Sequence, residues 1–296
     1  VMAITRNNPL GQTCGLICPD KFCMHACTRN AIDFPINIPK VQATILQKYH
    51  EQAEAHPMAQ PLDRRIAIVG AGPAGIAAAA RLARAGIGVV IFEARDQIGG
   101  ALNMIPQERL PHDVIERDWS FIQHDGHIDL RLNAPIDDIT QLCKDYDGVI
   151  VATGEPHCMA LGIDGEALSV SYMDYLHDPQ KYATTGAVAV IGGGNVATDC
   201  AVTAARSGAE SVEMFIRRRV CDMRISKSEH LELLAMGITP NGMMSPEKIE
   251  LNGDLKTLYV HKNICRNGKW MPLPNSTVAL PYFSLIIRAI GSRADA

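Results

Sequence analysis

Two glycine-rich turns constrain this chain more than any other feature of its sequence. The first, Gly70-Ala-Gly-Pro-Ala-Gly75, follows the apolar run 65–69 and precedes an alanine-rich stretch. The second, Gly192-Gly-Gly-Asn-Val-Ala197, follows the apolar run 188–191 in the same way. A buried strand, a glycine turn and a helix in this order open a parallel βαβ unit. The chain is therefore expected to contain two such units.

The stretches after each turn continue the alternation of strand and helix. After the first turn we expect helices over 74–85 and 112–124 and strands over 88–92, 128–132 and 148–151. After the second we expect helices over 196–207 and 226–236 and strands over 212–216, 256–261 and 282–290. Each turn is thus predicted to begin a doubly wound α/β domain of Rossmann type with a parallel sheet.

The first turn has the residues that a dinucleotide requires. Gly70 permits the tight turn, Gly72 lets the backbone approach a pyrophosphate, and Gly75 lets helix and strand pack closely. The pyrophosphate would lie at the positive end of the helix. Glu93 ends the second strand, where a carboxylate accepts hydrogen bonds from ribose hydroxyls and repels a 2′-phosphate. The site is predicted to bind FAD or NAD rather than NADP; a solvated strand-end acid is the alternative interpretation of Glu93.

The second turn has basic residues where the first has an acid. Its second strand is followed by Arg217-Arg218-Arg219, with Arg224 further on. Guanidinium groups bind phosphate through two parallel hydrogen bonds, which are stronger than neutral ones. The second site is therefore predicted to prefer NADPH over NADH. The alternative interpretation is a solvated basic face, because basic runs are common.

Four of the nine cysteines lie close together near the start of the sequence. Cys14, Cys18, Cys23 and Cys27 are separated by three, four and three residues. Zinc sites usually show two- or four-residue knuckles, and disulfides are disfavoured in a reducing compartment. Iron–sulfur ligation by thiolates is the favoured prediction, with zinc as the alternative. His25, inside this segment, is expected to be an exposed loop residue.

Composition excludes several other classes of protein. The chain has 296 residues, a net charge of −4 and a pI near 6.2, so no basic surface indicates nucleic acid. No apolar run reaches the roughly 18–20 residues that span a bilayer, and the start lacks a signal-peptide core. We expect a cytoplasmic protein without membrane insertion. A sequence that begins at Val1 and ends at Ala296, just after a strand, is expected to be part of a longer one.

Five motifs in register resemble one family. They are residues 8–18, 35–38 (Pro-Ile-Asn-Ile), 70–75, 105–111 (Ile-Pro-Gln-Glu-Arg-Leu-Pro) and the second turn with its arginines. Together they resemble the glutamate synthase small-subunit family, which includes the amino-terminal half of dihydropyrimidine dehydrogenase and a subunit associated with predicted selenate reductases. The similarity covers essentially the whole chain. It implies an oxidoreductase in which NADPH, FAD and [4Fe-4S] clusters form an electron-transfer relay.

The resemblance also implies roles for residues at matching positions of the first nucleotide site. Glu93 would bind the ribose of the FAD adenosine. The other expected FAD contacts are Gly70, Ala71, Gly72, Pro73, Ala74 and Gly75 at the pyrophosphate, Ala101 and Arg109 nearby, and the backbones of Ile17 and Ile136.

Matching positions of the second site would bind NADPH. The expected contacts are Gly192, Gly193, Gly194, Asn195 and Val196 at the phosphates and ribose, Arg217, Arg218 and Arg224 at the 2′-phosphate, and Ala289, Ile290 and Gly291 at the nicotinamide end. Asn195 departs from the aspartate that the family more often has. No general acid or base is expected, because hydride and electron transfer require positioning rather than proton transfer by the protein.

The same resemblance implies metal-binding residues in the cysteine segment. Cys18, Cys23 and Gln42 match ligands of one [4Fe-4S] cluster, and Cys27 matches a ligand of the other. Cys14 matches a family cysteine that need not be a ligand. The interval from Cys18 to Cys23 is one residue shorter than in the family. The upstream cysteines that complete both clusters, and the final segment that returns to the FAD domain, are expected to lie outside this sequence.

The sequence therefore predicts three parts: a small α-helical iron–sulfur segment over 1–60, an FAD-binding domain over 61–183 and an NADPH-binding domain over 184–296. The predicted function is to pass electrons from NADPH through FAD and clusters to a partner subunit or fused domain. One alternative is a flavoprotein of thioredoxin-reductase type, which needs a Cys-x-x-Cys pair that the sequence lacks. Another is a non-catalytic subunit that carries a flavin or cluster.

Overall fold

The computed structural model of the chain describes residues 1–19, 22–49, 59–123 and 126–294. The chain divides into two compact units, Val1–Gly154 and Glu155–Ala296. Residues 155–183 thus belong to the second unit, whereas the sequence groups them with the predicted FAD-binding domain, and the functional boundaries stay a prediction. The helical spacing of apolar residues also predicts a helix over 41–55, and the prolines at 57 and 61 predict a linker over 55–61. The end of that helix and most of that linker lie outside the described residues.

The first unit contains a four-stranded parallel sheet with the order β3-β2-β1-β4. The strands are β1 (Arg65–Val69), β2 (Gly88–Phe92), β3 (Ile128–Arg131) and β4 (Gly148–Val151). This order, with two strands on one side of β1 and the fourth on the other, is that of a Rossmann half. The predicted doubly wound α/β class is confirmed.

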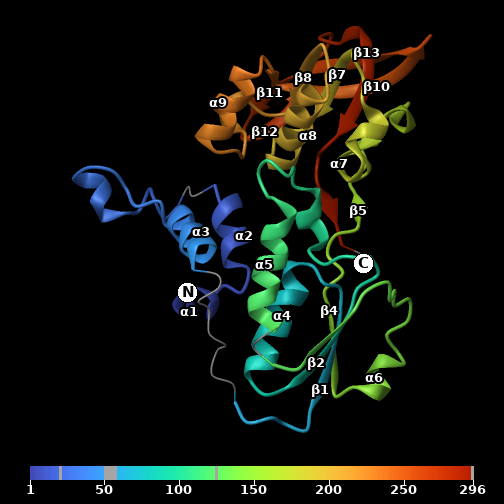
Figure 1. The fold of residues 1–296 in the computed structure, drawn as a ribbon. Helices are drawn as coiled ribbons and strands as arrows, with labels where there is room; N and C mark the ends of the chain where they lie inside the picture. The colour runs from blue at the N-terminus through green and yellow to red at the C-terminus, as the bar shows by residue number, and fades with distance from the viewer. Residues whose placement is uncertain (20–21, 50–58, 124–125, 295–296) are drawn as a thin grey trace. The chain divides into compact units, whose positions relative to one another are not determined.

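Helices cover both faces of this sheet (Figure 1). α4 (Pro73–Arg84) and α5 (His112–Gln123) pack against the face that carries Ile68 and Ile91. α6 (Leu142–Asp145) packs against the opposite face, which carries Val69 and Phe92. Neighbouring strand residues point to opposite faces, so the apolar runs that mark these strands supply two cores at once.

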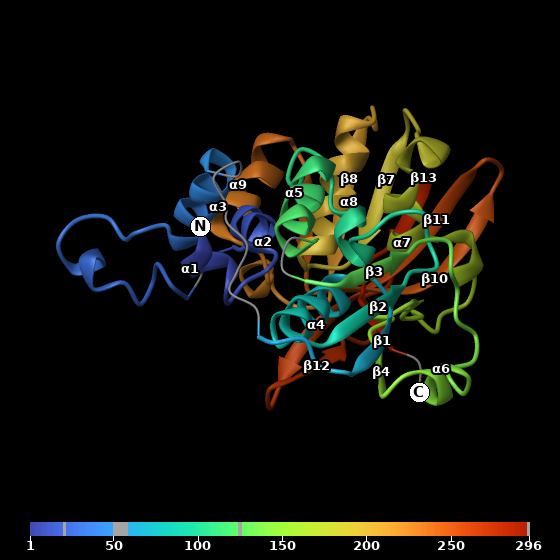
Figure 2. The same cartoon turned by 60° about the horizontal axis from the view of Figure 1, so that its bottom comes forward.

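Short helices precede the sheet: α1 (Met2–Thr5), α2 (Gly11–Ile17), the 3₁₀ turn η1 (Thr28–Ala31) and α3 (Ile38–Lys48). α2 and α3 pack together. The backbone N–H groups of Gln12 and Thr13 donate to the carboxylate of Asp118 on α5, at 3.0 and 2.7 Å. The segment that carries η1 runs out from α2 and α3 (Figure 2). Asp118 therefore ties the cysteine-bearing helix α2 to the first unit.

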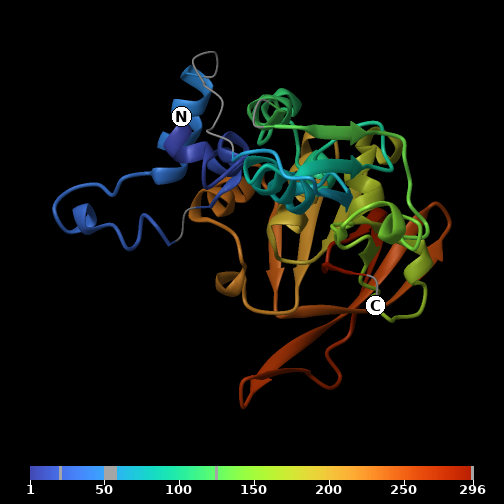
Figure 3. The ribbon, with the colours of Figure 1, turned by 90° about the horizontal axis from the view of Figure 1, so that it is seen from below.

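The second unit contains a mixed sheet with the order β10-β11-β13-β7-β8-β9. Four neighbouring strands, β13 to β9, are parallel, and β10 and β11 are antiparallel additions. β12 extends β11 as a hairpin (Figure 3), and β6 pairs with the end of β13. The bounds are β6 (Val170–Ser171), β7 (Ala187–Ile191), β8 (Ser211–Ile216), β9 (Thr239–Gly242), β10 (Met244–Asn252), β11 (Leu255–Arg266), β12 (Lys269–Pro272) and β13 (Val278–Arg288).

The helices of the second unit are α7 (Tyr172–His177), α8 (Asn195–Arg206) and α9 (Lys227–Ala235), with the 3₁₀ turns η4 (Glu166–Leu168), η5 (Pro179–Tyr182) and η6 (Val220–Asp222). α8 follows the second glycine turn, as the sequence predicts. α9 begins with a capping box in which Ser226 and Glu229 each bind the other's backbone N–H, which fixes where the preceding loop ends. A small ribbon joins β5 (His157–Cys158) to β14 (Ser292–Arg293).

A helix that spans a bilayer must be both long and apolar, and the described helices can be compared with that requirement. None of them combines the length and the apolar character that a bilayer-spanning helix needs.

Candidate functional site

The second glycine turn leaves open space in front of α8. Gly192 has a φ of +146°, and a Cβ there would lie 2.2 Å from the carbonyl oxygen of Ala289, so only glycine fits. At Gly194, the N-cap residue, an added Cβ would meet nothing within 4 Å, and no side chain caps the helix. The first N–H groups of α8 therefore face a space that suits an anion.

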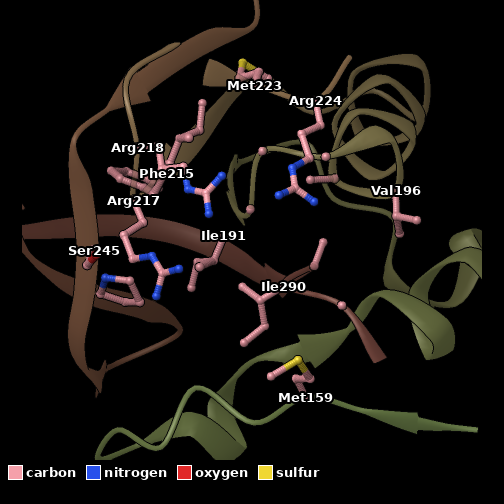
Figure 4. A pocket seen from close by; sticks show the side chains of 18 of the residues that line it. Met159, Ile191, Val196, Phe215, Arg217, Arg218, Met223, Arg224, Ser245 and Ile290 are labelled. Atoms are coloured by element: carbon pink, nitrogen blue, oxygen red, sulfur yellow. The ribbon is translucent and has the colours of Figure 1, made fainter. Parts of the chain in front are cut away.

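A cavity of about 720 Å³ opens over this turn (Figure 4). Its wall combines the turn, the residues after β8, the start of β10 and the end of β13, which are distant in sequence. Every residue predicted for the second site lines it: Gly192, Gly193, Gly194, Asn195, Val196, Arg217, Arg218, Arg224, Ala289, Ile290 and Gly291. A volume of this size suits a cofactor-sized ligand.

Three arginines give the cavity its charge. The side chains of Arg217, Arg218 and Arg224 point into it (Figure 4). Arg219 instead pairs with Asp222 through hydrogen bonds of 2.8 and 2.9 Å, which lower the pKa of that carboxyl group. Within the described part of the chain, the other three have no acidic partner at salt-bridge distance. Unpaired guanidinium groups that converge on one space favour a phosphate ligand.

Backbone contacts keep the loop after β8 beside the glycine turn. The N–H of Arg224 donates to the carbonyl of Gly193 at 3.3 Å, and the N–H of Gly192 donates to the carbonyl of Phe215 at 3.0 Å. The arginines are therefore attached to the same frame as the N–H groups of α8. One ligand could therefore bind its pyrophosphate to the N–H groups of α8 and a further phosphate to the arginines.

The first glycine turn has a similar geometry. A Cβ on Gly70 (φ +104°) would lie 2.5 Å from the carbonyl oxygen of Ala152, and one on Gly75 would lie 1.9 Å from that of Gly70. Gly72 is the N-cap of α4, without a side-chain cap, and the nearest atom to its added Cβ is the Cα of Gly100 at 4.0 Å. Close packing is needed at the first and third glycines, and the second leaves room for a ligand.

Glu93 lies beside this turn. The side chain is buried at the end of β2, and its two oxygens accept the N–H groups of Ala71 at 2.7 Å and Arg95 at 3.0 Å. The carboxylate is thus held against the turn by charge-assisted hydrogen bonds, with its remaining lone pairs free for ribose hydroxyls. An acid lies here at the position where the second site has Arg217 and Arg218.

The cysteine segment is more dispersed than either glycine turn. Cys14 is half-buried in α2 and Cys27 half-buried just before η1, whereas Cys18 and Cys23 are exposed. Among the residues that the structure describes, no three cysteine, histidine or acidic side chains come close enough to hold a metal. The described residues alone therefore do not fit a [4Fe-4S] cluster, which four thiolates usually hold.

Local contacts in this segment differ between the predicted ligands. Burial raises the pKa of the Cys14 thiol, which disfavours the thiolate that a metal needs. Backbone groups of Ile36 and Arg29 lower the pKa of Cys27 through hydrogen bonds. The amide of Gln42 donates to the carbonyl of Gly11 at 2.7 Å, which links α3 to α2. Of these residues, Cys27 has the environment most suited to a thiolate.

Comparison with known protein families matches residues 64–294 to the family described as pyridine nucleotide-disulphide oxidoreductase. This region includes both glycine turns and the cavity. The chain belongs to this family. It is an NAD(P)-dependent oxidoreductase. The order of strand, glycine turn, helix and polar strand end in the sequence predicts the same class. The family's name refers to a disulphide, but the printed sequence has no Cys-x-x-Cys pair.

Curated relatives within this family confirm the resemblance to the glutamate synthase small subunit. The NAD-dependent dihydropyrimidine dehydrogenase subunit PreT of Salmonella typhimurium is 32% identical, over 80% of this chain and 60% of its own length. The glutamate synthase [NADPH] small chain of Escherichia coli is 30% identical over 85% and 58%. The NADP(+)-dependent formate dehydrogenase subunit beta of Moorella thermoacetica is 33% identical over 78% and 35%. The chain thus spans less than two thirds of each of these relatives.

Solved structures share the fold. FprA of Mycobacterium tuberculosis, solved with NADPH, has a TM-score of 0.69 at 19% identity, over 80% of this chain and 72% of that one. Thioredoxin reductase of T. acidophilum has a TM-score of 0.56 at 17% identity, over 77% and 78%. At these identities the likenesses show the fold, which is of Rossmann type.

The other residues predicted for the first site lie in several different elements. Ala101 is exposed in η3 (Gly100–Met104), next to the glycine that approaches Gly72. Arg109 follows a turn in which its N–H donates to Pro106. Ile17 packs on the sheet face of α4 and α5, and Ile136 packs on the opposite face. The structure brings Glu93 to the turn, and the FAD contacts of the other residues stay a prediction.

About half of the residues in the cavity wall are not among those that the sequence predicts. The additional lining residues are Met159, Ala160, Leu161, Ile191, Ala197, Phe215, Ile216, Asp222, Met223, Met244, Ser245 and Pro246. Half of them adjoin the predicted motifs in sequence, whereas residues 159–161 and 244–246 have no motif around them. Asp222 and Ser245 are the polar additions. Ser245 lines the cavity because β10 lies antiparallel to β11, a pairing that no local signal in the sequence indicates.

Proposed function

We propose that this chain transfers hydride from NADPH to a bound FAD and delivers the electrons to an acceptor on a partner subunit or fused domain. Membership in the family supports the NAD(P)-dependent chemistry. The observation that carries the finer proposal is the contrast between two matching strand ends. Arg217 and Arg218, after β8, have no acidic partner at salt-bridge distance among the described residues and point into a cavity. Glu93, after β2, is instead held against the glycine turn that follows β1.

In this proposal the second unit binds NADPH. The N–H groups at the start of α8 hold the pyrophosphate, for which Gly194 leaves room. Arg217, Arg218 and Arg224 hold the 2′-phosphate by charge-assisted hydrogen bonds. The cavity beyond the turn is lined by Ala289, Ile290 and Gly291. In this proposal they contact the nicotinamide end, and none of them has a titratable side chain.

The first unit binds FAD in this proposal. The fixed carboxylate of Glu93 and the open N-terminus of α4 fit an adenosine ribose and a pyrophosphate without a 2′-phosphate. When bound, FAD accepts two electrons as hydride and releases them one at a time, which the nicotinamide does not do readily. The chain's residues orient the two cofactors and exclude water, and none of them needs to move a proton.

The names of the relatives leave the choice of nucleotide open. PreT is named as NAD-dependent, whereas the formate dehydrogenase subunit and the small chain are named for NADP(+) and NADPH. The three arginines support NADPH, because NADH lacks the 2′-phosphate whose charge they would neutralise.

Replacing Arg217 and Arg218 together by Ala tests this proposal. Hydrogen bonds to charged groups contribute about 1.5–3 kcal/mol each. The Kd for NADP⁺ should therefore rise about 10- to 100-fold, with little change for NAD⁺. Titration with adenosine 2′,5′-bisphosphate gives the same readout without flavin or partner. Lys248→Ala, which removes a half-buried cation that is paired with Glu250 outside the cavity wall, is the control. Equal losses for NADP⁺ and NAD⁺ would refute the assignment.

The iron–sulfur role is a separate proposal. We propose that Cys18, Cys23 and Cys27 ligate iron only together with thiolates that the described residues do not supply. The lowered pKa of Cys27 supports a thiolate there, and the lack of a three-residue group among the described residues sets the condition. Iron and acid-labile sulfide, measured after anaerobic purification of this chain, should fall well short of two clusters. Two complete clusters in this chain would refute the condition.

A further inference from the structure

A buried amide lies behind the arginine wall of the cavity. Asn263, on β11, is 4% exposed. Its Nδ2 donates to the carbonyl oxygen of Arg217 at 3.1 Å and to the hydroxyl oxygen of Ser245 at 2.8 Å. One side chain thus joins β11 to the residue after β8 and to the start of β10, both of which line the cavity.

A strained residue completes this connection. Met243 has a φ of +58°, a left-handed conformation that costs a non-glycine residue of its size stability. Its N–H donates to the carbonyl of Arg218 at 2.7 Å, and its carbonyl accepts the N–H of Asn263 at 2.6 Å. Such strain persists only where surrounding contacts over-determine the backbone, and it is concentrated at functional sites.

Three hydrogen bonds therefore fix the backbone of the arginine pair from behind. The carbonyl of Arg217 is held by Asn263, and that of Arg218 is held by Met243, which Asn263 holds in turn. The side chains of both arginines then leave a fixed backbone and enter the cavity from one wall (Figure 4). Side chains that start from a fixed backbone lose less conformational entropy when they bind, so the affinity for their ligand is higher.

The bond to Ser245 has a second effect. Because the Ser245 oxygen already accepts the Asn263 amide, its own O–H can donate to another acceptor. Ser245 lines the cavity on the same side as Arg217 (Figure 4). Its hydroxyl is therefore available as a neutral donor to a phosphate that the arginines bind.

We propose that Asn263 is a positioning residue that sets the preference for NADP(H) over NAD(H), through the backbone of Arg217 and the hydroxyl of Ser245. The inference rests on the proposed function, since it assigns a support to the 2′-phosphate site. An amide suits the position because both contacts need donors from one nitrogen, which neither a carboxylate nor an aliphatic side chain supplies.

Substitution of Asn263 in the full chain tests the proposal. Asn263→Ala should raise the Kd for NADP⁺ and for adenosine 2′,5′-bisphosphate about tenfold, and leave the Kd for NAD⁺ within about twofold. Asn263→Leu, which keeps the branching of the side chain at Cγ but cannot donate, should give the same shift if the alanine variant folds poorly. Asn241→Ala is the matched control, because it removes an amide that donates to Glu213 at 3.0 Å in the same sheet, outside the cavity wall.

A double-mutant cycle separates this proposal from a structural role. In an Arg217→Ala background, Asn263→Ala should weaken NADP⁺ binding far less than it does alone, because the group that it positions is gone. Full additivity, or equal weakening of NAD⁺ and NADP⁺ by Asn263→Ala, would overturn the proposal. If instead Arg217→Ala itself fails to discriminate the two nucleotides, the 2′-phosphate assignment falls, and the two failures are thereby distinguished.

Discussion

Glu93 and the arginine pair show how single residues after matching strands select different ligands. The carboxylate of Glu93 accepts two backbone N–H groups and is buried, so its charge is fixed next to the turn. Arg217 and Arg218 have no acidic partner in the described part of the chain and face a cavity. The two Rossmann units therefore share the glycine turn and helix N-terminus, and they differ in the sign of the charge after the second strand.

Glu93→Gln should lower both stability and flavin retention. A glutamine has one oxygen where two N–H groups need acceptors, and its NH₂ would face the N–H of Ala71 or Arg95. A buried donor left without an acceptor costs about 1–3 kcal/mol. Thermal unfolding and the ratio of FAD to protein after gel filtration measure the two effects. Unchanged flavin content in a destabilised variant would limit Glu93 to a structural role.

At the scale of elements, two glycines at the start of α8 have different roles: one is required by packing of the chain, and the other leaves room for a ligand. Gly192 and Gly194 lie two residues apart, yet an added Cβ would collide with Ala289 at the first and meet nothing at the second. Gly192 is therefore required for folding, and Gly194 is expected to be required for nucleotide binding.

Alanine substitutions should separate these two requirements. Gly192→Ala should cost at least about 1–2 kcal/mol of stability, because a positive φ and a backbone clash coincide there. Gly194→Ala should leave the melting temperature nearly unchanged but raise the Kd for NADP⁺ about tenfold, since its methyl group would occupy the pyrophosphate space. Calorimetry and nucleotide titration of both variants are the measurements. Undiminished NADP⁺ binding by Gly194→Ala would contradict the placement of the pyrophosphate.

Asp118 connects two other elements, because it accepts the first N–H groups of α2 from its place on α5. Burial raises its pKa, although the hydrogen bonds from Thr13 and Gln12 oppose the rise. In the unfolded chain the group ionises near its ordinary value of 3.8, and in the folded chain at a higher pH. Between those two values the folded chain binds more protons, so the free energy of unfolding falls as pH rises.

Asp118→Asn should remove this pH dependence. Urea unfolding of the wild type at several pH values above 4 should show stability falling and then levelling, whereas the variant should lack the fall. Hydrogen exchange in Gly11–Ile17 should also accelerate in Asp118→Ala, because the helix loses the acceptor at its start, worth about 0.5–2 kcal/mol. A wild-type slope that persists in the asparagine variant would assign it to another group.

For the whole molecule, the division into two units has a direct consequence. Every residue that lines the cavity lies between Met159 and Gly291, within the second unit. Residues 155–294, expressed alone, should therefore bind adenosine 2′,5′-bisphosphate with a Kd within about threefold of that of the whole chain. Isothermal titration compares the two. A fragment that folds, as circular dichroism would show, but does not bind would place essential contacts outside this unit.

Local sequence signals predicted those parts of the molecule that depend on neighbours in the chain. β1 and β2 have the predicted bounds, and α8 begins one residue before the predicted start. The apolar runs, the glycine spacing and the polar strand ends are all local. β10 was missed, because its Ser-Pro-Glu-Lys stretch lacks alternation and its register with β11 shifts between Pro246 and Lys248.

Contacts between distant segments were beyond these signals. Ser245 and Asn263 meet Arg217 only through the register of the antiparallel strands, which spacing does not encode. The cysteine spacing predicted ligands, but the described residues bring no three of them together. Residue type and spacing thus indicate which chemistry is available, and the tertiary pairing decides which groups share a site.

The pairing of Arg219 with Asp222 has a further consequence for how fast a nucleotide arrives. It leaves three cations facing the cavity, while the charge of a fourth is neutralised by Asp222 of the cavity wall. A concentrated positive field accelerates the encounter with a polyanion, and salt screens it beyond about 8 Å at physiological ionic strength. The association rate constant for NADPH should therefore fall more steeply with salt than that for NADH, which carries fewer negative charges. Preference for the phosphorylated nucleotide would then begin before contact, during diffusion.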